Sequence, residues 1–418
     1  MYDFLFLNAL YKGQRIDLAV AGSQIAALTP AGGLAQAEAR QRIDASDFLL
    51  RVPFYNTHTH HAMTLLRGLG EDAPLMEWLT QHIWPREAHL TPQAVYAGTR
   101  LAILESIRSG CVAFNDMYFH QPAAIRAAEE MGVRARIGLT MMNMVSEHIE
   151  NEATLALRDS LPETINLALA PHAPYTTTPE LLRQVAADAQ RLGLPIHIHL
   201  AETLTECAYV KEHFGFDTPA QYLHACGILQ PGTLLAHGCH LTESDLALVA
   251  EQGCVVIHCP QSNQKLASGI FPFAAAKAAG GRVTIGTDGA ASNNGLSMIA
   301  ETKAAYLQAK LHTPEGLSSP TLKDFDAAAT TAGAEALGFT NAGRIAVGAD
   351  ADLLFVNRKN VAFVGKGDPD ANFLLAADSS AVDTLLCHGK MLMQNGCIPG
   401  EEQILTEAQA AAEELFRD

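Results

Sequence analysis

The chain has 418 residues, with 28 lysines and arginines against 45 aspartates and glutamates, for a formal net charge of −17. Hydrophobic residues make up 48% and charged residues 17%, which favours a globular enzyme with a large buried core over a disordered chain. A chain this acidic is poorly suited to bind nucleic acid or anionic membranes, so neither is an expected partner. The length predicts one large α/β domain with a smaller one, or two domains.

The N-terminal residues carry no predicted signal peptide, because MYDFLFL lacks a basic region followed by an apolar stretch of the required length. No apolar run approaches the length needed to span a bilayer. The eight cysteines include no C-x-x-C pair and are interpreted as reduced, mostly buried thiols. A cytoplasmic location is therefore expected.

Short strands are predicted at both ends of the chain. Near the start they cover residues 3–10, 16–21, 25–28 and 48–52, and near the end they cover 351–356 and 382–387, followed by an Asn395-Gly396 hairpin turn. We expect segments 1–50 and 345–400 to form one discontinuous domain, a small β-sandwich. The Glu-rich tail 401–418 is predicted to be a surface helix.

Between these ends, apolar runs alternate with amphipathic segments. The runs cover residues 51–57, 111–115, 134–139, 166–171, 195–200, 233–237, 254–258 and 283–287. Helical spacing follows at 92–109, 122–131, 179–192, 243–251 and 295–310, often with a first-turn proline. Eight buried strands, each followed by a helix, predict an α/β fold, a (β/α)8 TIM barrel over residues 51–344. A doubly wound sheet is the alternative, although no glycine-rich nucleotide-binding motif supports it.

The first of these runs ends in His58 and His60. Residues two apart in a strand point to one face, so both imidazoles can hold one metal ion. A solvent-facing pair on an edge strand is the alternative. In a barrel of this kind, catalytic residues lie at the carboxyl ends of the strands.

Polar residues of the metal-binding type end five of the eight predicted strands, which packing alone does not explain. His58, His60, His199 and Asp288 form a ligand set that suits Zn²⁺, with Fe²⁺ or Mn²⁺ also possible. A bound metal would lower the pKa of a water molecule, and Asp288 could accept its proton. His237 would orient the hydroxide, and Glu202 would carry a proton to the substrate. Since strand 166–171 contains no lysine to bridge two metals, one ion is expected.

Several stretches resemble the amidohydrolase superfamily, in the branch of S-adenosylhomocysteine and 5'-methylthioadenosine deaminases and s-triazine hydrolases. They are NTHTH (56–60), MTLLRG (63–68), MEWL (76–79), NDMYF (115–119), PHAPY (171–175), HLAET (199–203), LASGI (266–270) and GTDGAASNN (286–294). The resemblance covers about residues 50–310. It implies a zinc-dependent hydrolytic deaminase acting on a small-molecule purine nucleoside, and a homo-oligomer.

The resemblance also implies roles for two residues of the substrate site. Glu87 matches a glutamate that binds the ribose hydroxyls, and a carboxylate can accept both hydrogen bonds of a vicinal diol. A solvated residue in a first helical turn is the alternative. His172 matches a histidine that contacts the purine. Trp78 is a candidate for the wall of the site, with core packing as its alternative.

One departure from that branch concerns the group on the 5' carbon. Deaminases that act on S-adenosylhomocysteine hold its carboxylate with two arginines after the third strand, where this chain has Leu139 and the apolar stretch 141–145. Arg134 and Arg136 lie within the strand and are interpreted as structural. A methionine-rich wall suits an apolar group. Methylthioadenosine, 5'-deoxyadenosine or adenosine are therefore expected rather than S-adenosylhomocysteine.

Other histidines stay outside the predicted site. His61 is interpreted as supporting or packing, His197 as a buried packing residue, and His258 is left unassigned. Ser292 and Asn293 are expected to brace the eighth loop.

Two alternative functions are kept beside the nucleoside deaminase. One is deamination of a free base or pterin, such as guanine or 8-oxoguanine, or hydrolysis of an s-triazine on the same metal site. The other, from a different class, is a metal-free binding or structural homologue. The complete ligand set argues against the latter, because unpaired polar clusters are costly to keep.

Overall fold

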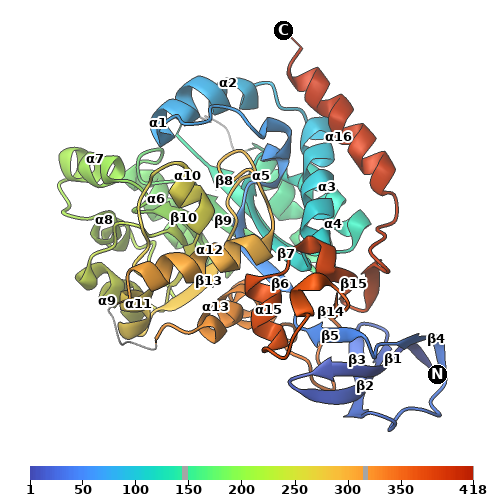
Figure 1. Cartoon of the computed structure of the whole chain (residues 1–418). Helices are drawn as coiled ribbons and strands as arrows, with labels where there is room; N and C mark the ends of the chain where they lie inside the picture. Colours follow the sequence, from blue (N-terminus) through green and yellow to red (C-terminus); the bar gives the residue numbers. More distant parts are fainter. Residues whose placement is uncertain (144–148, 314–318, 418) are drawn as a thin grey trace.

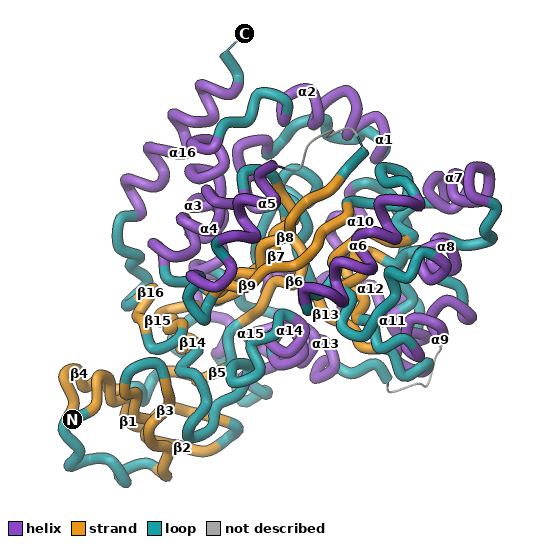
Figure 2. The backbone as a smooth tube through the Cα atoms, turned by 180° about the vertical axis from the view of Figure 1, so that it is seen from behind, coloured by secondary structure: helices purple, strands orange, loops and turns teal. Residues whose placement is uncertain are grey.

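Two parallel sheets of four strands each lie at the centre of the molecule. The computed structural model describes residues 1–143, 149–313 and 319–417. Within these residues the strand orders are β6-β7-β8-β9 and β10-β11-β12-β13. Their bounds are β6 (Phe54–Thr59), β7 (Cys111–Tyr118), β8 (Arg134–Met141), β9 (Ile165–Pro171), β10 (His197–Leu200), β11 (Leu234–His237), β12 (Val255–His258) and β13 (Arg282–Ile285). Figures 1 and 2 show these strands surrounded by helices.

The two sheets meet along two edges. A parallel bridge between Leu169 and Ile196 joins β9 to β10. On the other side, the Asp288 amide just beyond β13 donates to the carbonyl of His58 in β6, at 3.0 Å. This is an α/β fold of parallel strands, consistent with the predicted barrel. All eight predicted strands are present, with ends shifted by a few residues.

Helices follow the strands in the predicted order. They are α1 (Leu75–Glu77), α2 (Trp84–Glu87), α3 (Pro92–Arg108), α4 (Gln121–Met131), α5 (Ile149–Ala156), α6 (Pro179–Leu192), α7 (Leu204–Phe214), α8 (Pro219–Ala225), α9 (Glu243–Glu251), α10 (Pro260–Lys265), α11 (Phe273–Ala278), α12 (Met298–Leu311), α13 (Leu322–Ala329), α14 (Thr331–Ala336), α15 (Pro369–Leu375) and α16 (Glu401–Leu415). A π-helix, η2 (Trp78–Ile83), separates α1 from α2. Short 3₁₀ turns are η1 (His61–Leu66), η3 (Arg158–Ser160), η4 (Val361–Phe363) and η5 (Ser379–Ala381).

The expected helix starts at Pro92 and Pro179 are confirmed by their caps, and α8, which was not predicted, is capped in the same way. The hydroxyls of Thr91, Thr178 and Thr218 accept a backbone N–H of the first turn, and a proline follows each threonine. Over the part of the chain that the structure describes, no helix combines the length and the apolar character needed to cross a bilayer.

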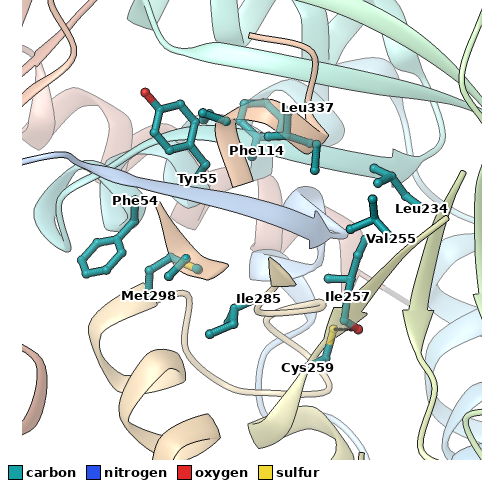
Figure 3. Packing of buried hydrophobic residues seen from close by; sticks show 14 of the residues in the cluster. Phe54, Tyr55, Phe114, Leu234, Val255, Ile257, Cys259, Ile285, Met298 and Leu337 are labelled. Carbon is teal, nitrogen blue, oxygen red and sulfur yellow. Dashed lines mark hydrogen bonds between the residues drawn. The ribbon is translucent and has the colours of Figure 1, made fainter. Parts of the chain in front are cut away.

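The main hydrophobic core fills the space between the strands and the surrounding helices. Figure 3 shows Phe54 and Tyr55 of β6 with Phe114 of β7, and, further along, Val255 and Ile257 of β12. Met298 of α12 and Ile285 of β13 belong to the same buried cluster. Because strands of both sheets share this cluster, they form one packed body.

Strands from the two ends of the chain share a separate sheet. Its order is β16-β15-β14-β5-β1-β2-β3, with β4 paired to β1. The bounds are β1 (Tyr2–Tyr11), β2 (Gln14–Ala21), β3 (Gln24–Pro30), β4 (Ala39–Asp44), β5 (Phe48–Arg51), β14 (Leu353–Asn357), β15 (Val382–Cys387) and β16 (Lys390–Met393). The predicted hairpin turn is confirmed, since Asn395 and Gly396 both have positive φ between the bridged Gln394 and Cys397.

Two details of this sheet differ from the prediction. Arg51 was assigned to the first barrel strand but ends β5 and pairs with Leu354 of β14. Pro53 separates the two strands because it has no N–H to continue the ladder. Strand β4 was not predicted, and its alternating exposed and half-buried residues mark it as an outer strand.

A buried ion cluster joins this sheet to the central strands. Arg134 of β8 donates to Asp350 at 2.7 Å and to Asp352 at 2.8 Å, and the Tyr55 hydroxyl donates to Asp352 at 2.6 Å. Arg136 donates to Asn166 and to the Ala336 carbonyl. Both arginines are structural, as expected.

The C-terminal helix α16 lies along α3 on the outside of the molecule (Figure 1). Arg108 and Arg100 of α3 pair with Glu401 and Glu407. The buried face of α16 includes Ala408 and Leu415, which join the hydrophobic cluster of η1, η2 and Leu75.

Candidate active site

Four polar side chains converge where the central strands end. His58 lies in β6, His60 directly follows that strand, His199 lies in β10, and Asp288 follows β13. One potential ligand atom from each lies within 4.8 Å of the other three, and all four residues are buried. Asp288 Oδ1 is 3.3 Å from His58 Nε2 and 3.2 Å from His60 Nε2. Two ligands about 2.1 Å from one metal are separated by about 3.0–3.5 Å, so these spacings suit a metal site.

The three imidazoles are oriented by hydrogen bonds through their Nδ1 atoms. His60 Nδ1 bonds the Met117 carbonyl and His199 Nδ1 bonds the His172 carbonyl, both at 2.6 Å. His58 Nδ1 lies 2.9 Å from His197 Nε2. All three Nε2 atoms are therefore left for the centre of the group. His58 Nε2 is buried without a hydrogen-bond partner, as expected of an atom that awaits a metal.

Asp288 presents its two carboxylate oxygens to different partners. Oδ1 faces the histidines, whereas Oδ2 accepts hydrogen bonds from Ser262 at 2.6 Å and from Ser292 at 2.8 Å. Burial raises the pKa of Asp288, but the neighbouring imidazoles of His58 and His60 outweigh it and hold the pKa well below its usual value. Asp288 is thus an anion, and its Oδ1 is available to bind a metal.

The charges of the imidazoles differ. Burial lowers the pKa of His58 to about 4. Burial, together with the nearby imidazole of His172, holds the pKa of His199 well below its usual value. Burial also disfavours the cation of His60, but Asp288 outweighs this and raises its pKa to about 9. Without a metal the group thus retains a proton beside Asp288, and metal binding would release it.

Glu202 and His237 lie beside this group. Glu202 Oε1 accepts a hydrogen bond from the Ser268 hydroxyl at 2.9 Å, and Oε2 lies 3.9 Å from His237 Nε2. His237 Nδ1 bonds Asn263 Oδ1 at 2.8 Å. Burial raises the pKa of Glu202, which favours the protonated acid. The 3.9 Å between the two side chains exceeds a direct hydrogen bond, so a proton would pass between them through one water molecule.

The backbone is strained at three of these positions. Ala201, His237 and Asp288 have φ of 50°, 74° and 60°, in the left-handed region that non-glycine residues rarely adopt. Such strain persists only where surrounding contacts impose it, and it is typical of functional sites.

A cavity opens onto this group. Its apolar lining comprises Met63, Leu75, Trp78, Leu79, Trp84, Met117, Phe119, Met142 and Leu266. The Trp78 indole N–H donates to the Leu69 carbonyl at 3.0 Å, which fixes the ring in the wall. Among the described lining residues there is no lysine or arginine.

Glu87 and His172 also line the cavity. Glu87 ends α2, is half-buried and lies beside the Tyr118 hydroxyl, so it is not the solvated first-turn residue of the alternative interpretation. Burial raises the pKa of Glu87. His172 Nδ1 bonds Thr176 Oγ1 at 2.9 Å, and burial lowers its pKa to about 3, which keeps the ring neutral. The structure thus brings every predicted site residue except His58 to the lining of one cavity, and His58 lies within the ligand group behind it.

The other histidines lie behind the site. His197 bonds His58 and Asn115, so it orients a potential ligand rather than only filling space. His61 stacks on Phe114 at 3.9 Å between ring centroids, and His258 packs near Phe271. Asn293 bonds the Thr287 carbonyl and Glu301, as expected for a residue that braces the eighth loop.

Four polar residues near the site were not predicted: Ser262, Asn263, Ser268 and Glu206. Ser268 lies in the LASGI stretch singled out above, and Ser262 and Asn263 lie in α10, which follows the seventh strand. The partners of Ser262, Asn263 and Ser268 lie on other segments, so only the folded chain reveals these contacts. Glu206 instead binds amides of the segment just before it.

Comparisons with known proteins agree with this geometry. Residues 53–392 match the Amidohydrolase family. A 5'-deoxyadenosine deaminase of Methanospirillum hungatei JF-1 is 42% identical over 382 residues, which are 90% of this chain and 84% of that protein. A 5-methylthioadenosine/S-adenosylhomocysteine deaminase of Pelotomaculum thermopropionicum is 39% identical, covering 95% and 93% of the two chains. The crystal structure of an adenosine deaminase from Xanthomonas campestris with bound zinc has a TM-score of 0.93 and 32% identity, covering 99% and 98% of the two chains.

Proposed function

The chain belongs to the amidohydrolase family, and from this premise we propose that it is a metal-dependent hydrolase that deaminates an adenine nucleoside to the inosine analogue and ammonia. The observation that carries the proposal is one cavity that contains the His–His–His–Asp group, the Glu202–His237 pair and Glu87. The first two parts suit hydrolysis, and the third suits a ribose.

The proposed metal is one Zn²⁺ per subunit, held by His58, His60, His199 and Asp288, a set that also fits Fe²⁺ or Mn²⁺. When bound, such an ion lowers the pKa of water and supplies hydroxide at neutral pH. Asp288 accepts a proton from the attacking water, and His237 orients that water by a hydrogen bond. Glu202 donates a proton to the ring nitrogen next to the carbon that bears the amine, which makes this carbon electrophilic.

The proposed substrate contacts follow from the cavity lining. Glu87 accepts hydrogen bonds from the ribose 2' and 3' hydroxyls, His172 contacts the purine, and Trp78 forms part of the apolar wall. Met142 is the described member of the methionine-rich stretch in this lining, whereas Met144 and Val145 lie outside the described residues. With no described cation to hold a carboxylate, an uncharged 5' group is preferred to the amino-acid tail of S-adenosylhomocysteine.

A substrate screen that follows ammonia release tests this proposal. We expect turnover of methylthioadenosine, 5'-deoxyadenosine or adenosine, slower turnover of S-adenosylhomocysteine, and none of guanine or 8-oxoguanine. Turnover of the free bases alone, or of s-triazines alone, would contradict the nucleoside assignment. Metal analysis of the purified protein tests the metal-free alternative, since a protein without bound metal cannot be this enzyme.

The ribose contact is tested by Glu87→Gln. Charge-assisted hydrogen bonds contribute about 1.5–3 kcal/mol, so kcat/KM for a ribonucleoside is expected to fall about 10- to 100-fold. With 2',3'-dideoxyadenosine, wild type and variant should differ by less than about threefold, because the hydroxyls are absent. Glu77→Gln, an exposed residue of the same segment, is the control. Equal losses on both substrates would rule out the ribose contact.

We further propose that the eight central strands form a closed (β/α)8 barrel over residues 51–344, with a small β-sandwich domain from 1–50 and 345–400. The support is the short contact between β13 and β6 and a separate cluster around Phe6 and Phe355.

A cytoplasmic location is proposed because all eight cysteines are free. A homo-oligomer is proposed because Ile270, Leu307 and Leu311 expose apolar side chains along one groove. Sedimentation velocity tests the proposed homo-oligomer.

A further inference from the structure

The helix that follows Glu202 begins with an unusual cap. Thr203 is the N-cap of α7, and its hydroxyl accepts the Glu206 N–H at 3.2 Å. In a capping box the acid at this third helical position returns to the N–H of the N-cap residue. Glu206 instead accepts the Ala201 N–H on Oε1 at 2.8 Å and the Glu202 N–H on Oε2 at 3.0 Å. Its carboxylate therefore holds the turn that carries Glu202.

This turn is one of the strained positions of the site. Ala201 adopts φ of 50°, and its side chain is buried. Glu206 itself is only 2% exposed. Burial raises the pKa of its carboxyl to about 7, although both backbone N–H groups oppose this rise. Burying a carboxylate is costly, so its place beneath the turn calls for a compensating role.

We propose that Glu206 is a positioning residue, which fixes the backbone of Ala201 and Glu202 so that the Glu202 carboxyl faces the substrate. Glu206 is not among the residues that line the cavity, and it acts through Glu202. The two hydrogen bonds set the backbone of the turn, and the Ser268 hydroxyl sets one carboxylate oxygen. This inference rests on the proposed role of Glu202 in deamination.

A second helix of the chain provides the ordinary arrangement. Thr242 caps α9, and Asp245 returns to the Thr242 N–H at 3.0 Å in a complete capping box. Asp245 is as buried as Glu206, at 1% exposed, and follows the next strand end. It binds no amide of a candidate catalytic residue. Asp245→Asn is therefore the matched control for Glu206→Gln.

The test compares both variants with wild type for bound zinc, melting temperature, kcat and KM on the nucleoside that the wild type deaminates. Glutamine keeps the shape of Glu206 but can accept only one of the two amides. We expect Glu206→Gln to lower kcat about 10- to 100-fold, with KM within about twofold and zinc unchanged. Asp245→Asn should lower the melting temperature about as much as Glu206→Gln does. Its kcat should stay within about twofold of the wild-type value.

Hydrogen exchange provides a readout that needs no substrate. The amides of Ala201 and Glu202 should be protected in wild type and lose protection in Glu206→Gln but not in Asp245→Asn. If Glu206→Gln does not fold, Glu206→Asp replaces it, since the shorter side chain keeps the charge but cannot reach both amides. Unprotected amides in wild type, unchanged protection in the folded variant, or a kcat equal to wild type would overturn the inference. Absence of nucleoside deamination by wild type would instead overturn the proposed function, leaving exchange to decide whether Glu206 holds the turn.

Discussion

Glu202→Gln is expected to abolish turnover while one metal ion per subunit stays bound. The change removes the proton that Glu202 would donate and keeps the size of the side chain. General acid–base catalysis contributes about 10²–10⁴-fold to the rate of a reaction, so kcat should fall by at least about 10³-fold. Glu202 lies outside the group of four ligands, so its amide analogue should leave the metal in place.

The measurement combines ammonia release with metal analysis of the same sample. Glu243→Gln, on the exposed first turn of α9, is the control and should behave as wild type. Ser268→Ala should give an intermediate loss, because it removes one hydrogen bond to Glu202 but keeps the carboxyl. A Glu202→Gln protein that has lost its metal, or that retains a tenth of the wild-type kcat, would show that the residue has another role.

His60→Ala is expected to lose the metal, whereas His61→Ala, a change at the next residue in the chain, is expected to retain it. His60 directs Nε2 at the centre of the ligand group, whereas His61 stacks its ring on Phe114. Loss of a partner that only orients a ligand already costs 10- to 100-fold in metal affinity. Loss of His60 itself should exceed this, and kcat should fall more than about 10³-fold.

Metal content after dialysis against metal-free buffer, followed by activity with added Zn²⁺, checks this pair. His61→Ala should retain metal and activity and lose only stability, since it leaves a cavity beside Phe114. The assignment of the ligands would be wrong if His61→Ala lost its metal, or if His60→Ala kept it. Adding Fe²⁺ or Mn²⁺ to the metal-free wild type compares the three candidate metals.

Much of the site could be predicted because its residues lie at the ends of strands. Parallel strands direct their carboxyl ends to one side, so His58, His199 and Asp288 were expected to meet although they are far apart in sequence. Helix starts were equally accessible, because threonine and proline signals act within one turn. These features could be predicted because they depend on local backbone geometry and on a fold class that allows few arrangements of its strands and helices.

Other features were not predictable for physical reasons. A serine hydroxyl has no preferred partner in the sequence, and Ser262 of α10 reaches Asp288 only because the fold brings the segments after β12 and β13 together. Glu206 appears in the sequence as an ordinary N3 capping acid, and only the left-handed Ala201 makes both earlier amides available. The π-helix that carries Trp78 is a tertiary adjustment, since no local propensity specifies it.

The sheet shared by both ends of the chain has a consequence for biosynthesis. Arg51 at the end of β5 pairs with Asp370, 319 residues later, and β5 itself pairs with β14. A ribosome adding roughly 5–20 residues per second needs about 15–60 seconds to cover this distance. During that time one edge of β5 is without its neighbour, and all eight central strands, β6 to β13, are made before β14. Completion of this sheet is therefore a late step, which follows the synthesis of all the central strands.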